Sequence, residues 1–246
     1  MIDESSRKIA IRVGVCGFPV SQDQLFHHLD VVEVQKTFYN FLSEKNLSRL
    51  REKAPSSFLF TMKAFQGITH PFSSPTYRRT KLPPHFVPQN LGFFQPTPEV
   101  EESARRTIQE ARALGASVVV VQCPPSFLAT SVNIAHLYQF FESLERDNLI
   151  WGFEPRGKWP VETIKKICQD LSLIHIVDPF YSIPITKDIF YFRLHGKGSY
   201  HYRYTPQEIK ELAEKLKAVS GKGFCLFNNT AMFENALELK EVLILE

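Results

Sequence analysis

Hydrophobic and polar residues alternate in blocks along the chain, and eight of the apolar blocks are short. Each of the eight is rich in β-branched or aromatic residues and is bounded by turn-forming or polar residues. Runs of this length and composition are typical of strands buried in a sheet. The predicted strands are residues 11–18, 31–38, 57–65, 117–124, 149–156, 173–180, 190–196 and 223–229.

Between these strands, apolar residues recur at three- and four-residue spacing, the period of helices that pack one face against a sheet. One such helix starts at Thr205, which is followed by Pro206 and by Glu208. This is an N-cap residue with proline in the first turn and an acid three residues on. The predicted helices are residues 42–54, 98–115, 131–146, 160–171, 205–219 and 231–245.

Strand and helix alternate almost throughout, without a linker or a low-complexity stretch. Eight alternations favour a (β/α)8 barrel over an open doubly wound sheet, which more often has fewer strands. The sequence therefore predicts an α/β protein in which residues 1–246 form a single TIM-type barrel domain. Closing this barrel requires the first strand, 11–18, to pair with the last, 223–229.

Two connections depart from the alternation. Residues 66–98 form a long loop rich in proline and aromatic residues after the third strand, and such loops inside a domain are usually functional or disordered. Residues 181–188, after the sixth strand, are too short and too interrupted by proline for a full helix. Both follow the carboxyl end of a strand, which is the side where barrel active sites are built.

Composition is that of an ordinary globular protein. The chain has 246 residues, 43% of them hydrophobic, and its net charge of +3 is too small to imply a nucleic-acid or membrane partner by itself. The amino terminus has no apolar signal-like run, and the longest aliphatic run, residues 118–121, is too short to cross a bilayer. We therefore expect a soluble, cytoplasmic protein with no membrane partner.

The four cysteines are scattered and show no C-x-x-C spacing. This pattern predicts small buried thiols in a reducing compartment, and it argues against a disulfide or a zinc–thiolate site. The residues are Cys16, Cys123, Cys168 and Cys225.

Nearly every predicted strand ends in a polar side chain. Glu33 and Arg193 stand inside apolar runs, where an unpaired charge would be costly. Glu154 and Arg156 lie two residues apart and so point to one face of a strand. Because the carboxyl ends of barrel strands meet at one mouth, we expect these charges to converge there. The strand-end residues are Glu33, Gln35, Thr37, Lys63, Gln122, Glu154, Arg156, Asp178, Arg193, His195, Asn228 and Asn229.

Six segments carry a recognisable pattern: VEVQKTFY at 32–39, FTMKAFQGITH at 60–70, VVQCPPSF at 120–127, EPRGKW at 154–159, FRLHG at 192–196 and LFNN at 226–229. In order and spacing they resemble the domain of unknown function 72 family, also called YecE-like. The resemblance implies a TIM-barrel fold and no established reaction. The chain departs from the family pattern at Gly157, where that pattern would place a histidine. The resemblance supports as motif positions Glu33, Thr37, Tyr39, Lys63, Thr69, His70, Gln122, Glu154, Arg156, Arg193, His195, Asn228 and Asn229.

These residue types favour acid–base or hydrolytic chemistry on a small anionic substrate that bears a phosphate or a carboxylate. Lysine and arginine bind oxyanions, and carboxylates or histidine transfer protons. We predict catalytic roles for Glu33, Glu154 and His195, and no cofactor. The predicted substrate-binding residues are Lys63, His70, Gln122, Arg156, Arg193, Asn228 and Asn229.

Arg193 has two roles open to it in this scheme. It could be kept for the ligand, or it could be a structural counter-ion to Glu33 or Glu154. The sequence favours the ligand, so that replacing Arg193 would remove affinity and leave the fold intact.

A divalent metal site is the first alternative hypothesis. Carboxylates and histidine are ligands for Mg²⁺, Mn²⁺ or Zn²⁺, as in barrels of the xylose-isomerase and apurinic-endonuclease types. Interleaved cations such as Lys63 would compete with the metal, and a lone strand histidine such as His175 is more often satisfied in the core. The alternative ligand set is Glu33, Glu154, Asp178 and His195.

A second alternative is binding of nucleic acid or a nucleotide without chemistry. The segment SYHYRYTP at 199–206 interleaves aromatic and basic side chains, which could stack on bases and contact phosphates. For the cations of the loops after the third and seventh strands, a solvated surface is as good an interpretation as binding of the anionic substrate. Those cations are Arg78, Arg79, Lys81, Lys197, His201 and Arg203.

Overall fold

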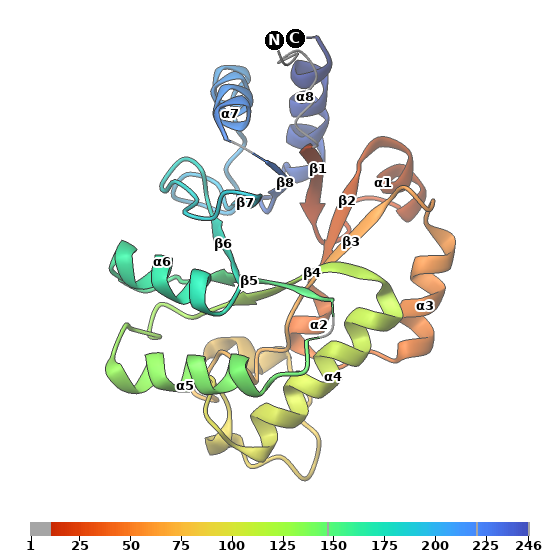
Figure 1. Cartoon of the computed structure of the whole chain (residues 1–246). Coiled ribbons are helices and arrows are strands. Elements are labelled where there is room, and N and C mark those ends of the chain that lie inside the picture. Colours follow the sequence, from red (N-terminus) through yellow and green to blue (C-terminus); the bar gives the residue numbers. More distant parts are fainter. Residues whose placement is uncertain (1–10, 147, 220, 246) are drawn as a thin grey trace, which may run out of the picture.

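The structure is a computed structural model that describes residues 11–146, 148–219 and 221–245. Its eight parallel strands close into a barrel in chain order, with the helices outside the ring (Figure 1). β1 pairs with β8, so the predicted TIM-type barrel and its closure by the first and last strands are confirmed. The strands are β1 Ile11–Cys16, β2 Val31–Val34, β3 Leu59–Lys63, β4 Ala116–Gln122, β5 Ile150–Glu154, β6 Ile174–Val177, β7 Ile189–Leu194 and β8 Lys222–Phe227.

The six predicted helices are present, with small shifts at their ends. The helix predicted from Thr205 has the full capping box, in which Thr205 and Glu208 bond reciprocally. Residues 178–188, between β6 and β7, form no helix. The helices are α1 Gln22–His28, α2 Lys36–Tyr39, α3 Glu44–Lys53, α4 Pro98–Leu114, α5 Ser131–Ser143, α6 Val161–Asp170, α7 Pro206–Ala218 and α8 Met232–Leu245, with short 3-10 helices η1 Pro75–Arg79 and η2 Pro88–Asn90.

Successive side chains of each strand alternate between two apolar layers. In β7, Phe190 and Phe192 belong to the large cluster that includes buried helix residues, whereas Tyr191 belongs to a smaller cluster of residues from six strands. That smaller cluster also contains Val31 and Val120, and it fills the inside of the barrel. The inward face of each strand therefore continues, at its carboxyl end, into the barrel mouth.

The prediction for residues 31–38 is wrong in its second half. β2 stops at Val34, Gln35 has helical backbone angles, and a short helix, α2, begins at Lys36. Thr37 is thus in a helix, where its hydroxyl donates to the carbonyl oxygens of Val34 and Lys63, at 3.1 and 2.7 Å. The reason is tertiary: this turn places Phe38 beneath the side chain of Lys63, and local apolar pattern alone could not distinguish that from a longer strand.

The helix α1 was not predicted, although its start has a clear signal. Ser21 caps the helix and Gln24 bonds back to it, which is a capping box at the helix start. The helix is short and buries only Leu25, so its apolar periodicity is weak.

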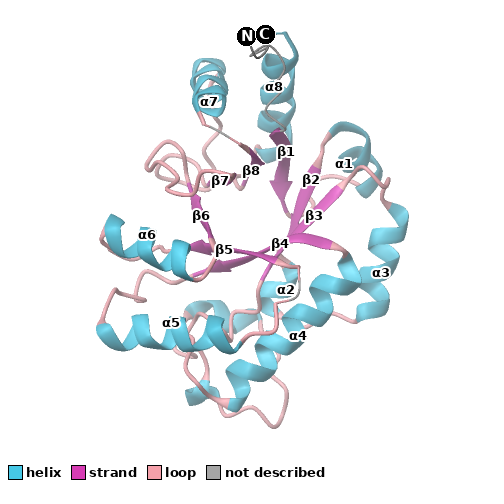
Figure 2. Ribbon diagram, viewed as in Figure 1, coloured by secondary structure: helices cyan, strands magenta, loops and turns pink. Residues whose placement is uncertain are grey.

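The long loop at 66–98 is ordered around a small core of its own. Phe65, Tyr77, Phe86 and Leu91 form a separate buried cluster beside the barrel. Figure 2 draws the segment mostly as loop with short helical turns. The segment is therefore a packed extension of the barrel rim.

Two further expectations concern bulk properties. All four cysteines are buried and free, as predicted. Within the described ranges, no helix has both the length and the apolar character needed to cross a membrane.

Candidate active site at the barrel mouth

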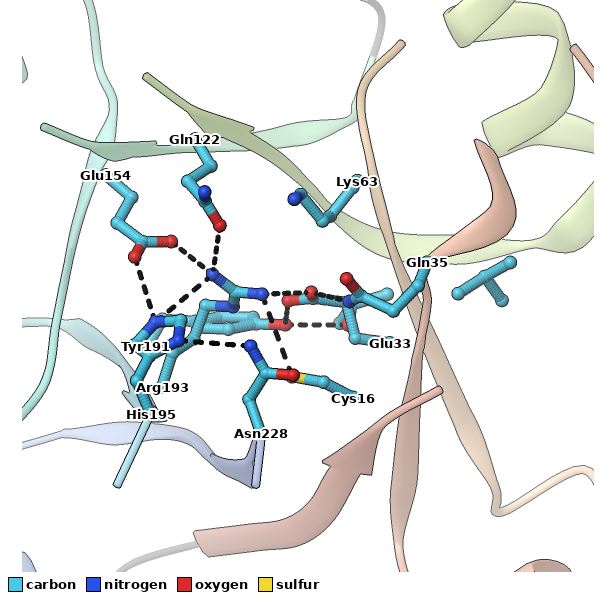
Figure 3. Close-up of polar contacts among 12 residues, drawn as sticks. Cys16, Glu33, Gln35, Lys63, Gln122, Glu154, Tyr191, Arg193, His195 and Asn228 are labelled. Atoms are coloured by element: carbon cyan, nitrogen blue, oxygen red, sulfur yellow. Dashed lines mark hydrogen bonds and ion pairs between the residues drawn. The ribbon is translucent and has the colours of Figure 1, made fainter. Parts of the chain in front are cut away.

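Most of the predicted site residues come together because they continue the inward faces of their strands. Glu33 stands two residues after Val31, Arg193 two after Tyr191, and His195 two after Arg193. A period of two keeps such side chains on one face. Figure 3 shows the result: side chains from β1, β2, β3, β4, β5, β7 and the end of β8 point toward one centre.

Arg193 occupies that centre. Its side chain is 0% exposed, and it forms ion pairs with Glu33, at 2.8 Å, and with Glu154. The same guanidinium donates to Gln122 at 2.8 Å (Figure 3). Arg193 is therefore the buried counter-ion of two carboxylates, one from β2 and one from β5. This corrects the expectation that it is an accessible ligand for substrate, because its charge is already neutralised and no solvent reaches it.

Glu33 lies on the floor of the site, out of reach of solvent. Tyr191 donates its hydroxyl to Glu33 at 2.7 Å and in turn accepts from Thr61 at 2.7 Å. Gln35 donates to the other oxygen of Glu33, which also pairs with Arg193. Both carboxylate oxygens are thus engaged. Glu33 is 0% exposed, so the geometry gives it a positioning role in place of the predicted direct catalytic one.

Three side chains contact the ring of His195, and one of them is Arg193, whose guanidinium nitrogen lies 3.5 Å from Nε2 (Figure 3). The same Nε2 lies 3.1 Å from Glu154, and Nδ1 of the ring lies 3.1 Å from the amide nitrogen of Asn228. A carboxylate can only accept, so Nε2 carries the proton and Nδ1 accepts from Asn228. Burial lowers the pKa of His195, and the hydrogen bond to Glu154 opposes this effect. The ring is therefore neutral near pH 7, with an unprotonated Nδ1.

Glu154 is ionised, and its carboxylate holds the ring of His195 in place. Arg156 donates to Glu154 at 2.8 Å, so the same-face prediction for residues 154 and 156 is met, although Arg156 lies just beyond the end of β5. Burial by itself would raise the pKa of Glu154, but the charge of Arg193 and the hydrogen bond from His195 hold it well below its ordinary value. Glu154 is therefore a poor proton donor or acceptor.

A large hollow, here called the mouth cavity, opens above this network. It has a volume of about 1000 Å³, and its lining includes Lys63, Gln122, Arg156, His195 and Asn228. A second hollow of about 450 Å³, the side pocket, lies by β5 and β6. Arg156 and His195 line both, so they form the wall between them.

The lining of the mouth cavity is cationic. Lys36, Lys63, Arg79 and Arg156 face it, and among the described residues no carboxylate lines it. Arg156 is paired with Glu154. No described carboxylate forms an ion pair with the other three.

His70 and Asn229 are placed behind the cavity wall. His70 is 5% exposed, and its ring pairs with Thr69 at 2.7 Å. Asn229 is fully buried and donates to the carbonyl of Tyr202 and to Asn235. Neither lines the mouth cavity or the side pocket, which corrects their assignment as direct ligands of substrate.

The alternative metal ligands do not fit a metal ion. The guanidinium of Arg193 lies between Glu33 and Glu154, and it occupies the oxygens that a cation would need. Asp178 accepts from the backbone nitrogens of Phe180 and His195, at 3.0 and 3.1 Å. Within residues 11–146, 148–219 and 221–245, no group of three or more potential ligands is arranged to hold a metal.

Sequence reasoning missed Tyr191 and Lys36. Tyr191 bridges Thr61 and Glu33, and its signal was its place two residues before Arg193. Lys36 was not identified because the predicted strand, residues 31–38, included it, whereas the structure places it at the start of α2. His175 also differs from expectation: it is buried as predicted, but its Nδ1 has no hydrogen-bond partner among the residues that the structure describes.

Gly157, where the family pattern would place a histidine, has no room for a side chain. A Cβ atom there would lie 2.7 Å from the carbonyl oxygen of Phe127 and 2.9 Å from that of Pro125. The proline-rich turn after β4 therefore takes up the space. A catalytic scheme that needs a histidine at this position does not apply to this chain.

Comparisons with known proteins agree with the motif pattern. The profile of a family described as "Protein of unknown function DUF72" matches residues 23–245. No curated protein matches the chain. Among solved structures, a DUF72 family protein from Enterococcus faecalis V583 has a TM-score of 0.75 at 20% identity, over 96% of each chain.

Two further structures extend the likeness. A DUF72 family protein from Thermotoga maritima MSB8 has a TM-score of 0.68 at 21% identity, over 96% of this chain and 99% of that one. A xylose isomerase domain containing protein from Salmonella typhimurium LT2 has a TM-score of 0.61 at 12% identity, over 95% and 96%. At these identities the structural likeness supports the fold alone.

Proposed function

This chain belongs to the DUF72 family, and we propose that it is an enzyme that acts on a small substrate bearing a phosphate or carboxylate group. The substrate binds in the mouth cavity, and the chemistry is acid–base in type. The family has no described function, so the proposal rests on the chemistry of the site.

One observation carries the proposal: the mouth cavity collects cations that the protein does not neutralise. Lys36, Lys63 and Arg79 line it without a carboxylate partner among the described residues, and Arg156 adds a guanidinium at the wall. Clustered cations in a concave site repel one another, and an anionic ligand relieves that repulsion. Arginine adds directional, bidentate binding of an oxyanion.

His195 is the proton carrier in this scheme. Its unprotonated Nδ1 is held only by the amide of Asn228, and both residues line the mouth cavity. A substrate group that displaces this amide would meet a neutral imidazole, which is the form that accepts a proton. Glu154 stabilises the imidazolium that results, because its charge lies 3.1 Å from Nε2. Glu154 and Glu33 are then positioning residues.

The binding part is tested by titrating the protein with inorganic pyrophosphate at two salt concentrations. We expect Arg79→Ala and Arg156→Ala each to weaken affinity about tenfold, because each removes a charged hydrogen-bond donor. Arg49→Ala, at an exposed residue of α3 outside the cavity lining, is the matched control and should bind as the parent does. Equal affinity in all three variants would refute the anion site.

The catalytic part is tested by incubating the protein with a panel of sugar phosphates and hydroxy acids and following their conversion. His195→Gln should abolish turnover and change pyrophosphate affinity less than threefold, since the imidazole moves a proton and carries no charge in the resting site. If this variant keeps its turnover, the assignment of His195 is wrong.

A second candidate function, binding of nucleotides or single-stranded nucleic acid, is favoured by two aromatic side chains. Phe18 and Tyr200 line the mouth cavity and are 36% and 51% exposed, which suits stacking on bases. Two other side chains of the segment 199–206 already have partners within the protein. Tyr202 forms a hydrogen bond with Glu208, and Arg203 forms one with Glu238. Tight, salt-dependent oligonucleotide binding without turnover would favour this function.

A further inference from the structure

Lys63 is the buried amine of the mouth cavity. It ends β3, is 5% exposed, and its Nζ lies 3.6 Å from the centre of the Phe38 ring. Within the described part of the chain, no acceptor forms a hydrogen bond or ion pair with this nitrogen. In Figure 3 the side chain extends from β3 beside the Arg193 network, and no dashed line reaches its nitrogen.

The surroundings of Lys63 favour its neutral form. Burial lowers its pKa to about 8, and the charge of Arg193 acts in the same direction, whereas Glu33 and Glu154 oppose them. With this pKa, about a tenth of the amine is unprotonated at pH 7. The charged and titratable groups that act on it or line the same cavity are Cys16, Glu33, Lys36, Tyr39, His70, Arg79, Glu154, Arg156, Arg193, His195 and Tyr200.

A lysine that served only to attract an anion would be better placed in water or beside a carboxylate, where it stays charged. The mouth cavity already has fixed charge in Arg79 and Arg156. Burying one more lysine against an aromatic ring and beside an arginine weakens it as a cation and activates it as a nucleophile. This is the arrangement found where lysine amines attack carbonyl groups.

We propose that Lys63 is a nucleophile that forms an imine with an aldehyde or ketone carrying an anionic group. The inference rests on the proposed function and narrows its substrate class to anionic carbonyl compounds. Imine formation gives the enzyme an electron sink next to the former carbonyl carbon, and this directs the acid–base chemistry of His195 to the bonds beside that carbon.

The reaction needs no co-reactant. The lone pair of Nζ attacks the carbonyl carbon, a carbon–nitrogen bond forms, and the carbonyl π electrons move to oxygen, which takes up a proton. The nitrogen loses a proton, and the resulting hydroxyl is protonated and leaves as water. A carbon–nitrogen double bond remains, so one water is released for each imine formed. No group is oxidised or reduced.

The test uses pyridoxal 5′-phosphate, an aldehyde with a phosphate group, as the probe at pH 7. Borohydride reduces any imine to a stable amine, and peptide mapping by mass spectrometry locates the label. At pH 7, a pKa of about 8 in place of 10.5 raises the unprotonated fraction about 300-fold. Because a weaker base is also a weaker nucleophile, we expect at least about tenfold more label on Lys63 than on the exposed Lys45.

Three controls connect the label to the site. Pyridoxal, which lacks the phosphate, should label Lys63 much less, and pyridoxine 5′-phosphate, which lacks the aldehyde, should protect it. Lys63→Arg should lose the label at position 63. Because that variant could be destabilised by the larger side chain, its unfolding is measured alongside, and the mapping on the parent protein decides in either case.

The outcomes separate the two proposals. Binding of pyridoxine 5′-phosphate with no label at Lys63 after treatment with pyridoxal 5′-phosphate overturns the imine and leaves the anion site standing. Equal labelling of Lys63 by pyridoxal and its phosphate, without protection, overturns the anion site, and with it the anionic substrate class. If the label is spread evenly over exposed lysines and pyridoxine 5′-phosphate does not bind, both the imine and the anion site are overturned.

Discussion

Replacing Arg193 by methionine is expected to lower the free energy of unfolding by about 3–5 kcal/mol, because it leaves two buried carboxylates without their shared counter-ion. Glu33 is 0% exposed, and Glu154 is 4% exposed. Urea denaturation at pH 7 measures the loss. Adding Glu33→Gln to Arg193→Met should restore part of it, since one of the two uncompensated charges is then removed.

Arg156→Ala is the matched control, because Arg156 binds the same carboxylate as Arg193. It is 38% exposed, and Glu154 keeps its pair with Arg193 when Arg156 is removed. The expected loss is therefore below about 1 kcal/mol, as for other half-exposed ion pairs. The counter-ion role of Arg193 is wrong if Arg193→Met unfolds at the same urea concentration as the parent.

The second large effect is acid destabilisation through buried histidines. Burial lowers the pKa of His70 to about 3, with help from the charge of Lys63, and burial lowers that of His175 to about 4. Both values lie below the ordinary 6.5, so the unfolded chain binds more protons between pH 6.5 and 4. These neutral histidines stabilise the folded protein fully above pH 6.5, and this stabilisation decreases as the pH is lowered. Between pH 6.5 and pH 5, the contribution of each histidine to the free energy of unfolding falls by about 2 kcal/mol.

Two carboxyl groups, Asp178 and Glu110, act the opposite way, because burial raises the pKa of each. Burial raises the pKa of Glu110 to about 8, so the folded protein binds the extra proton and gains about 2 kcal/mol between pH 6.5 and 5. The parent protein is therefore expected to lose about 1–2 kcal/mol net from His70, His175 and Glu110. His195, whose pKa burial also lowers, acts in the same direction as His70 and His175.

Single variants isolate each histidine from Glu110. His70→Asn and His175→Asn should each reduce the difference in unfolding free energy between pH 6.5 and pH 5 by about 2 kcal/mol relative to the parent. His27→Gln, at an exposed histidine of α1, is the control and should leave that difference as in the parent. Equal pH dependence in all four proteins would contradict the assignment.

Much of the fold could be predicted because its signals are local. Apolar runs such as the one around Val118 and Val121 are buried on both faces of a parallel strand, and the helices between them carry one apolar face. The errors lie where local pattern is ambiguous. Residues 36–39 are apolar and aromatic in part, and only their packing beside β3 selects a helical turn over a longer strand.

The membership of the site was also predictable in part. Glu33, Gln122, Glu154 and Arg193 stand at inward positions near strand ends, and barrel geometry brings such positions to one mouth. His70 and Asn229 lie in loops, whose course has no period from which the direction of a side chain could be predicted. Both turned out to point into packed surroundings behind the cavity.

By itself, the sequence determined that eight strands close into a barrel and that their charged ends meet, since both follow from spacing along the chain. Only the tertiary structure decided which charges neutralise each other. Arg193 is enclosed by Glu33 and Glu154 from other strands, whereas Lys63 has no carboxylate partner among the described residues. Pairing and solvent exposure depend on distances between strands far apart in sequence, and those distances separate a buried ion pair from an amine without a carboxylate partner.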